Sequence, residues 1–270
     1  MNELFLDAFF TEQWRGKDAF AVVDQLSGEV FREVKNRRTL RFECAGESFF
    51  LKYHGGVGWR EIFKNLFSLK LPVLGAGNEF RAIRKLEQLG IDTMYCAAYG
   101  ERGANPAKRK SFIVTGDLGS IPSLEDICAT WQAAPPKPCF KRALISRVAK
   151  VSRALAANGM NHRDYYLCHF LLKSGEGEDF TLHLIDLHRM EIRRKIPYRY
   201  LIKDLGGLWF SAMDANLSRA DVLRFIAVYS GRPLREELTV NGKLWNDVAR
   251  VGDKLYCKVH NRPPRHPFSS

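Results

Sequence analysis

The pattern of hydrophobic residues changes near residue 115, and this change constrains the fold more than any other feature. Before it, short stretches rich in β-branched and aromatic residues alternate with polar turns, and one helical stretch, residues 78–90, lies among them. The strands expected there are residues 29–34, 39–43, 48–53 and 111–115. The first two flank a polar turn, which is typical of a β-hairpin.

Helical spacing dominates after a loop at residues 133–138. Apolar residues recur at helical positions from Leu144 to Leu155, and Asn158-Gly159 is typical of a helix end. Two strand-like pieces follow, at 170–172 and 180–185, and residues 200–260 are mostly helical in pattern. The sequence therefore predicts an α+β fold with a small antiparallel-sheet N-lobe and a larger, mostly helical C-lobe.

The charge balance predicts an anionic partner. The 270 residues include 42 Lys and Arg against 30 Asp and Glu, which gives a formal net charge of +12. Nucleic acid, an acidic lipid surface, a phosphorylated substrate and an acidic protein all fit such a charge. The charge alone does not choose among them.

Neither a membrane-spanning helix nor a secretion signal is expected. Apolar runs are only a few residues long, whereas a spanning helix needs about 20, and Glu3 and Asp7 stand where a signal peptide carries basic residues. We therefore expect a cytosolic protein. Its six scattered cysteines include no CxxC pair and are expected to be reduced thiols. The cysteine and histidines between positions 168 and 188 lack any standard zinc-ligand spacing.

Four ionisable residues, taken in their order along the chain, are the main candidates for a catalytic site. They are Lys52 in an expected strand, Glu79 at the start of the expected helix, Asp164 in His162-Arg163-Asp164 just past a helix, and Asp186 at the end of an apolar strand. This order resembles that of the two-lobed protein-kinase fold. The tripeptide alone is a weak signal, so the interpretation depends on the joint order and placement.

Phosphoryl transfer gives a physical reason for each of these residue types. Phosphoryl transfer depends on charge placed around the transferred group, which a lysine on a rigid strand supplies and a helix glutamate holds in place. An aspartate on a loop can accept the proton of an incoming hydroxyl. An aspartate at a strand end can bind the divalent ion that bridges phosphate oxygens.

Taken singly, most of these residues also fit a plainer interpretation. Lys52 suits a solvated strand position, and Glu79 suits the first turn of a helix, where the dipole favours an acid. Asp164 suits a helix N-cap. Asp186 is harder to explain in this way, because a carboxylate among apolar neighbours needs a cation or hydrogen-bond donors.

The sequence also departs from ordinary protein kinases. The turn at residues 35–38 contains no glycine, so the usual glycine-rich loop is absent. His169 stands where an asparagine normally binds a second metal ion, and His188 replaces the glycine that normally follows the metal-binding aspartate by two positions. The motif that ends a protein-kinase activation segment is missing. A platform for protein substrates is therefore not expected.

The resemblance becomes more specific in two segments. Residues 159–172, GMNHRDYYLCHFLL, and residues 185–189, IDLHR, resemble the bacterial lipopolysaccharide core heptose kinase family, in which a histidine at the asparagine place is itself a mark. Residues 112–118 look like the hinge of that family, although Gly116 stands where we expect an acid. The similarity covers about residues 1–260.

The resemblance implies ATP-dependent phosphorylation of a hydroxyl on the first inner-core heptose, at the cytoplasmic face of the inner membrane. It implies residues 1–115 as the nucleotide-binding lobe, 116–260 as the catalytic and acceptor-binding lobe, and 261–270 as a loose basic tail. Asp164 would be the base, with Arg163 beside it, and Asp186 the principal metal ligand, with His169 as a further contact to the metal or to a phosphate. The implied cofactors are ATP and Mg²⁺, with Mn²⁺ as the alternative. The implied nucleotide-binding residues are Lys52, Glu79, Val114, Thr115 and Asp117.

Two basic segments suit anionic partners. Arg189, Arg193, Arg194 and Lys195 follow the expected metal ligand, where a kinase arranges its acceptor, and a lipopolysaccharide core is rich in carboxylates and phosphates. A solvated basic face is the alternative. Residues 59–70 form a basic amphipathic stretch that fits either an anionic membrane surface or packing against the small lobe.

Other functions stay open at this point. A kinase of another small molecule, of the aminoglycoside or choline type, would need an acidic acceptor pocket for its cationic substrate, which the basic run disfavours. A non-catalytic kinase-like module that binds an anionic partner is a further alternative, and an acidic protein partner fits the net charge. We expect no nucleic-acid partner, because the interleaved aromatic and basic motif of single-strand binders is lacking.

Overall fold

The computed structural model divides the chain into two compact units. The structure describes residues 2–34, 37–56, 75–105, 107–175, 179–264 and 266–268. Unit 1 comprises residues 1–88, 93–119 and 187–189, and unit 2 comprises residues 89–92, 120–186 and 190–270. The amphipathic stretch at 59–70 lies outside the described residues. Among the described helices, none is both long enough and apolar enough to cross a membrane.

Unit 1 is built on a six-stranded sheet with the order β1-β5-β6-β4-β3-β2, in which every neighbouring pair is antiparallel. Its strands are β1 (Glu3–Leu6), β2 (Glu29–Val34), β3 (Arg37–Cys44), β4 (Glu47–His54), β5 (Cys96–Arg102) and β6 (Lys110–Gly116). The four strands expected from the sequence correspond to β2, β3, β4 and β6. Strand β4 lies between β3 and β6, so a side chain on it has strands on both sides.

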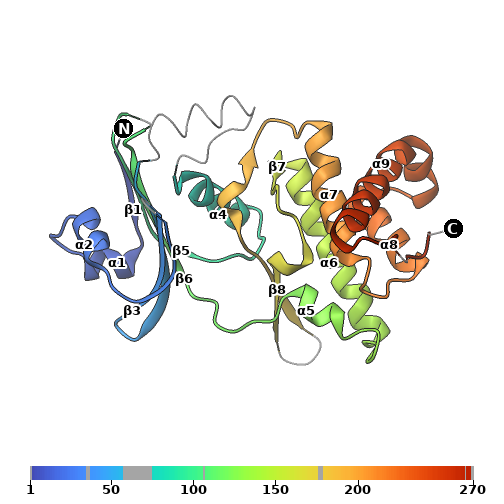
Figure 1. The fold of residues 1–270 in the computed structure, drawn as a ribbon, viewed down its shortest axis with the longest axis horizontal. Coiled ribbons are helices and arrows are strands. Elements are labelled where there is room, and N and C mark those ends of the chain that lie inside the picture. Colours follow the sequence, from blue (N-terminus) through green and yellow to red (C-terminus); the bar gives the residue numbers. More distant parts are fainter. Residues whose placement is uncertain are drawn as a thin grey trace. The chain divides into compact units, whose positions relative to one another are not determined.

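Three described helices cover this sheet. Helices α1 (Ala8–Gln13) and α2 (Ala19–Gln25) lie on one side, and α4 (Gly77–Gln88) lies on the other (Figure 1). Phe10, Phe20 and Leu51 are buried in the core under α1 and α2. Because successive strand residues point to opposite faces, Lys52 projects from the face opposite Leu51, toward the side of α4.

Unit 2 is mostly helical. Its helices are α5 (Leu124–Ala129), α6 (Pro138–Ala157), α7 (Tyr198–Ala212), α8 (Arg219–Ser230) and α9 (Leu234–His260), which has a non-helical residue at Asn241. Helix α7 packs on α9 and α6 packs on α8 (Figure 1). Apolar side chains of α7, α8 and α9 share a core that includes Leu205, Ile226, Trp245 and Val248.

Two small antiparallel pairs of strands complete unit 2. Strand β7 (Met160–Asn161) pairs with β10 (Glu191–Ile192), and β8 (Phe170–Ser174) pairs with β9 (Phe180–Leu184). The first pair brackets the loop that follows α6. The second pair carries the chain from Asp164 to Asp186. The fold is therefore α+β with an antiparallel-sheet N-lobe and a helical C-lobe, as the sequence predicts.

The C-terminal segment, expected to be a loose tail, makes side-chain contacts inside unit 2. The His266 side chain is 6% exposed, and its Nε2 lies 3.2 Å from Asp253 Oδ1. Its ring also lies edge-on to Trp209, with 5.1 Å between the ring centroids. His266 and Phe268 line an apolar cavity of about 370 Å³ whose other walls come from α5 to α9.

Candidate active site

Within unit 1, an ion pair joins two of the predicted site residues. Lys52 Nζ on β4 lies 2.6 Å from Glu79 Oε1 in the first turn of α4. The Glu79 side chain is only 1% exposed, whereas that of Lys52 is 27% exposed. A buried carboxylate needs a cation or donors, and the ammonium of Lys52 supplies both. The structure therefore brings together the strand lysine and the helix glutamate that the sequence singled out.

Within unit 2, the loop that follows β7 carries Asp164. His162 is fully buried, and its Nε2–H donates a hydrogen bond of 3.0 Å to the carbonyl oxygen of Ile185, next to Asp186. Arg163 has a φ of 76°, a left-handed conformation that is strained for a residue with a side chain. This backbone turn lies between the buried His162 and Asp164.

One imidazole links the two aspartates of unit 2. His169 Nδ1–H donates a 2.6 Å hydrogen bond to the carbonyl oxygen of Asp164, and its Nε2 lies 3.5 Å from Asp186 Oδ2. Because a carbonyl oxygen only accepts, Nδ1 carries a proton, and Nε2 is the ring nitrogen that faces the Asp186 carboxylate. Asp186 itself has a left-handed φ of 60°. Asp164, His169 and Asp186, which span 22 positions of the sequence, thus meet around one imidazole.

The donor set around Asp186 fits a hard cation only in part. Mg²⁺ is usually held by one or two carboxylates, with waters and phosphate oxygens completing its shell. Asp186 Oδ2 and His169 Nε2 would be the two protein ligands, of which the imidazole is the weaker for such an ion. Across the described ranges, no cluster of three or more acidic, cysteine or histidine side chains could hold a metal ion.

The hinge residues lie in unit 1 at the end of β6. Val114 and Thr115 are buried and pair with strands on both sides, so their main chain belongs to the sheet. The Asp117 carboxylate accepts hydrogen bonds from Ser48 Oγ and Gly119 N and pairs with Arg41. Burial opposes ionisation of Asp117, but these bonds prevail and hold its pKa below the usual value. That side chain is therefore engaged within unit 1.

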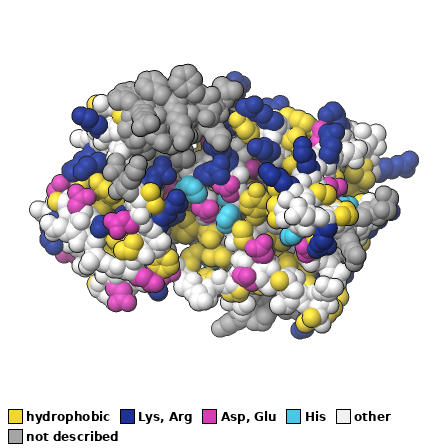
Figure 2. Space-filling model, in the orientation of Figure 1, with side chains coloured by type: hydrophobic (Ala, Val, Ile, Leu, Met, Phe, Trp, Pro, Cys, Tyr) yellow, Lys and Arg dark blue, Asp and Glu magenta, His cyan; other side chains and the backbone are white. Residues whose placement is uncertain are grey.

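The expected acceptor residues differ in their surroundings. Arg189 belongs to a short 3₁₀ turn (Leu187–Arg189) of unit 1, whereas the other three belong to unit 2. Arg194 and Lys195 are exposed. Arg193 forms a close ion pair with Glu191 and lies over the ring of Tyr200. Figure 2 shows Lys and Arg side chains gathered near the top of α7.

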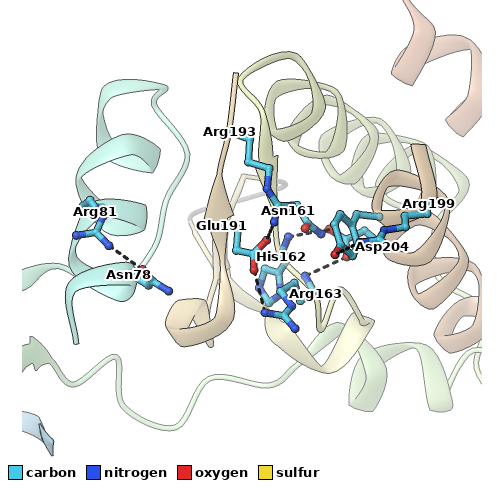
Figure 3. A network of polar contacts seen from close by, with 10 residues as sticks. Asn78, Arg81, Asn161, His162, Arg163, Glu191, Arg193, Arg199 and Asp204 are labelled. Carbon is cyan, nitrogen blue, oxygen red and sulfur yellow. Dashed lines mark hydrogen bonds and ion pairs between the residues drawn. The ribbon is translucent and has the colours of Figure 1, made fainter. Parts of the chain in front are cut away.

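The structure also reveals a residue that the sequence did not indicate. Asp204 of α7 accepts hydrogen bonds from the Asn161 side chain and from the main-chain N–H groups of His162 and Arg163 (Figure 3). No sequence signal indicates this contact, because Asp204 follows Lys203 in a helix of mixed polar and apolar residues, 40 residues after Asp164. Burial is the largest cause that raises the pKa of Asp204, to about 6.

Burial also makes the stability of unit 2 sensitive to acid through His162. Desolvation lowers the pKa of His162 to about 4 from its ordinary 6.5. The unfolded chain therefore takes up a proton at this residue below about pH 6.5, while the folded chain resists until about pH 4. His162 therefore contributes its full share to the free energy of unfolding above about pH 6.5. As the pH falls from about 6.5 to about 4, that contribution decreases by up to about 3 kcal/mol.

Urea unfolding at pH 7.5 and 4.5 measures this effect. We expect the wild-type protein to lose more unfolding free energy between these two pH values than His162→Asn, which has no imidazole to protonate. Equal losses in the two proteins would contradict the assignment.

The comparisons with known proteins agree with this geometry. The fold and the order of its ionisable residues are those of a protein-kinase-like phosphotransferase. The chain belongs to the Lipopolysaccharide kinase (Kdo/WaaP) family, whose profile matches residues 21–229. The resemblance drawn from residues 159–172 and 185–189 is thereby confirmed.

Three relatives show how far the similarity extends. The chain is 52% identical over 245 residues to the lipopolysaccharide core heptose(I) kinase WaaP of Escherichia coli K12, covering 90% of this chain and 92% of that protein. It is 47% identical over 256 residues to WaaP of Pseudomonas aeruginosa, covering 94% and 96%. A solved structure of WaaP in complex with acyl carrier protein superposes with a TM-score of 0.81 at 42% identity, covering 94% of this chain and 99% of that one. The chain is accordingly a kinase of lipopolysaccharide biosynthesis.

Proposed function

We propose that this protein transfers the γ-phosphoryl group of ATP to a hydroxyl of the first heptose of the lipopolysaccharide inner core. The observation that carries the proposal is the His169 imidazole, which joins the Asp164 main chain to the Asp186 carboxylate. It ties the main chain of the loop residue Asp164 to the neighbourhood of the Asp186 carboxylate, within unit 2. Such a pair is what transfer to an alcohol requires: a proton acceptor and a holder for the cation on the phosphates.

Each residue has a role in the proposed reaction. Asp164 orients the heptose hydroxyl and accepts its proton. Lys52, held by Glu79, neutralises phosphate charge of the nucleotide. Asp186 and His169 hold Mg²⁺, with Mn²⁺ as the alternative; when bound, the ion offsets the negative charge of the phosphate oxygens. Val114, Thr115 and Asp117 border the nucleotide base.

The basic residues of unit 2 are proposed to bind the acidic acceptor. Arg194 and Lys195 are exposed and can reach carboxylates and phosphates of the core. Arg193 is already paired with Glu191, so its contribution is to shape this segment. Arg189 is proposed to bind the acceptor as well.

The same positive charge supports two partner proposals. An acyl carrier protein is bound in the solved relative, and an acidic carrier protein suits a chain with a net charge of +12. We propose that this chain also binds an acyl carrier protein. We further propose that it works at the cytoplasmic face of the inner membrane, where the anionic surface attracts basic proteins.

Mass spectrometry of the acceptor tests the reaction. Purified protein, ATP and Mg²⁺ are incubated with core oligosaccharide that lacks phosphate on its first heptose, and a gain of one phosphate group on that sugar is expected. A chelator should abolish the gain, and an aminoglycoside offered instead should stay unmodified. Phosphorylation of the aminoglycoside without phosphorylation of the core would contradict the proposal.

A further inference from the structure

Two arginine side chains lie against the ring of Tyr200, in the first turn of α7. Arg199 Cζ lies 4.5 Å from the ring centroid, and Arg193 Cζ lies 4.9 Å from it. Arg199 Nη2 also donates a 2.7 Å hydrogen bond to Tyr200 Oη. The negative face of an aromatic ring attracts a guanidinium group placed over it. Tyr200 therefore orients two cations on one ring.

The two arginines differ in what balances their charge. Arg193 forms a close ion pair with Glu191, whose carboxylate it shares with Arg163. Arg199 is exposed, and its contacts at Tyr200 are with an aromatic ring and a hydroxyl group, neither of which offsets its charge. Residues 189–203 contain six Lys and Arg and one acid, Glu191. This segment therefore carries an excess of positive charge, and Arg199 is an oriented and accessible part of it.

The first turn of α7 is fastened to α9 through the residue before Arg199. Tyr198 Oη donates a 2.7 Å hydrogen bond to Asp247 Oδ2 of α9, and the two helices pack along each other. Arg199 thus projects from an anchored helix, and Tyr200 holds its guanidinium before any ligand binds. A pre-organised side chain loses less conformational entropy when it binds, so more of its interaction energy appears as affinity.

Arginine at position 199 does not serve the stability of the helix itself. Arg199 is the second residue of α7, where the positive end of the helix dipole opposes a cation. The first turn, residues 198–201, contains no acid that would compensate. An arginine that is costly for its own helix, exposed and held in one orientation is better explained by a binding role.

A run of contacts within unit 2 leads from this turn to the residue beside the proposed base. Arg193 lies over Tyr200 and pairs with Glu191. Glu191 Oε1 in turn accepts a 3.0 Å hydrogen bond from Arg163 Nη1, as Figure 3 shows. Arg163 immediately precedes Asp164. An acceptor whose hydroxyl lies at Asp164 can therefore extend along this run toward the first turn of α7.

We propose that Arg199, oriented by Tyr200, binds an anionic group of the acceptor, a carboxylate or a phosphate, away from the hydroxyl that receives the phosphoryl group. The planar guanidinium matches either group through two parallel N–H···O bonds. The inference rests on the proposed function. It extends that function because it assigns recognition of the acceptor's charge to a residue of α7, with Tyr200 as its positioning residue.

Steady-state kinetics of Arg199→Gln, with ATP and core oligosaccharide, test the proposal. Glutamine keeps hydrogen-bonding capacity but lacks the charge and the two-pronged geometry. We expect the KM for the core to rise about 10-fold, the effect of losing a hydrogen bond to a charged group. The KM for ATP and kcat should stay within about twofold, because the group bound lies away from the reacting atoms. An unchanged KM for the core would overturn the proposal.

Arg235→Gln is the matched control. Arg235 is the second residue of α9, just as Arg199 is the second residue of α7; both are exposed, and both helices follow a proline N-cap. We expect Arg235→Gln to keep the wild-type KM for the core. Both variants should melt within about 2 °C of the wild-type protein, since both side chains are at the surface. An equal rise in KM for the two variants would show a general effect of charge and would overturn the role of Arg199.

Two modified acceptors identify the anionic group. In one, the carboxyl groups of the core oligosaccharide are converted to methyl esters; in the other, its phosphates are removed enzymatically. The acceptor that lacks the group bound by Arg199 should give the same KM with the wild-type protein and with Arg199→Gln. The other acceptor should keep the difference of about 10-fold. A difference that persists with both acceptors would overturn the proposal.

An acidic carrier protein is the competing occupant of this surface. Isothermal titration should show that acyl carrier protein binds Arg199→Gln as tightly as the wild-type protein. Weaker binding of the carrier protein together with an unchanged KM for the core would overturn the proposal. If the wild-type protein itself did not phosphorylate the core, the proposed function would fail; if it did so while Arg199→Gln kept the wild-type KM, only the role of Arg199 would fail.

Discussion

Replacing Asp164 by asparagine is expected to lower kcat by about 10² to 10⁴-fold, the range that a positioned general base contributes. Asparagine keeps the shape of the side chain and removes the carboxylate that we propose accepts the proton of the acceptor hydroxyl. The main-chain carbonyl that receives the His169 hydrogen bond is retained, so the neighbourhood of Asp186 should keep its geometry. Phosphate transfer to core oligosaccharide, followed by mass spectrometry, measures the loss.

The fold should tolerate this change. Asp164 is only half-buried, so its substitution should alter the unfolding free energy by less than about 1 kcal/mol. Asp179→Asn is the control, because Asp179 is an exposed acid in the turn of the β8–β9 hairpin. If Asp164→Asn kept wild-type activity, Asp164 would not be the base.

Replacing Lys52 by methionine is expected to lower the free energy of unfolding more than replacing Glu79 or Arg84. Methionine fills a similar volume but leaves the Glu79 carboxylate, 1% exposed, without its ammonium partner. Breaking a buried pair from one side costs about 3–5 kcal/mol. Because Lys52 is 27% exposed, we expect the lower end, about 3 kcal/mol in the free energy of denaturant unfolding. Loss of the phosphate-binding ammonium should abolish transfer as well.

The converse substitution should cost less. Glu79→Gln leaves the Lys52 ammonium behind, and water can reach that group because it is partly exposed. About 1 kcal/mol is expected. Arg84→Met provides the control, since the Arg84–Glu87 pair of the same helix is exposed on both sides and should change stability by less than about 0.5 kcal/mol. A loss no larger for Lys52→Met than for Arg84→Met would show that the Lys52–Glu79 pair does not stabilise unit 1.

The sequence predicted those parts of the fold and site that local patterns encode. Four strands of unit 1, the helix that carries Glu79 and the long helix before Gly159 follow from hydrophobic periodicity and turn residues. Strands β1 and β5 were not predicted, because β1 has only four residues and β5 (CAAYGER) contains alanine, glycine and charged residues but no β-branched one. Lys52 and Glu79 were identified by their order along the chain.

Long-range contacts lay beyond local patterns. Asp204 forms hydrogen bonds with residues 161–163, which lie more than 40 positions earlier in the chain, and no pattern in its helix indicates that contact. Arg193 looked like a free cation beside Arg194, yet Glu191 engages it. Residues 187–189 group with unit 1 although the chain on both sides belongs to unit 2. Such assignments depend on which surfaces meet in three dimensions, and a single sequence does not encode them locally.

The left-handed backbone at Arg163 and Asp186 has a consequence for engineering heat-resistant variants. Glycine adopts such angles without steric cost, and proteins commonly exchange strain at functional sites for stability when turnover is not selected. Directed evolution scored on thermal tolerance alone would drift toward glycine or asparagine at these two positions. The resulting proteins would survive heating but carry no working chemistry, so any such library has to be screened for both properties together.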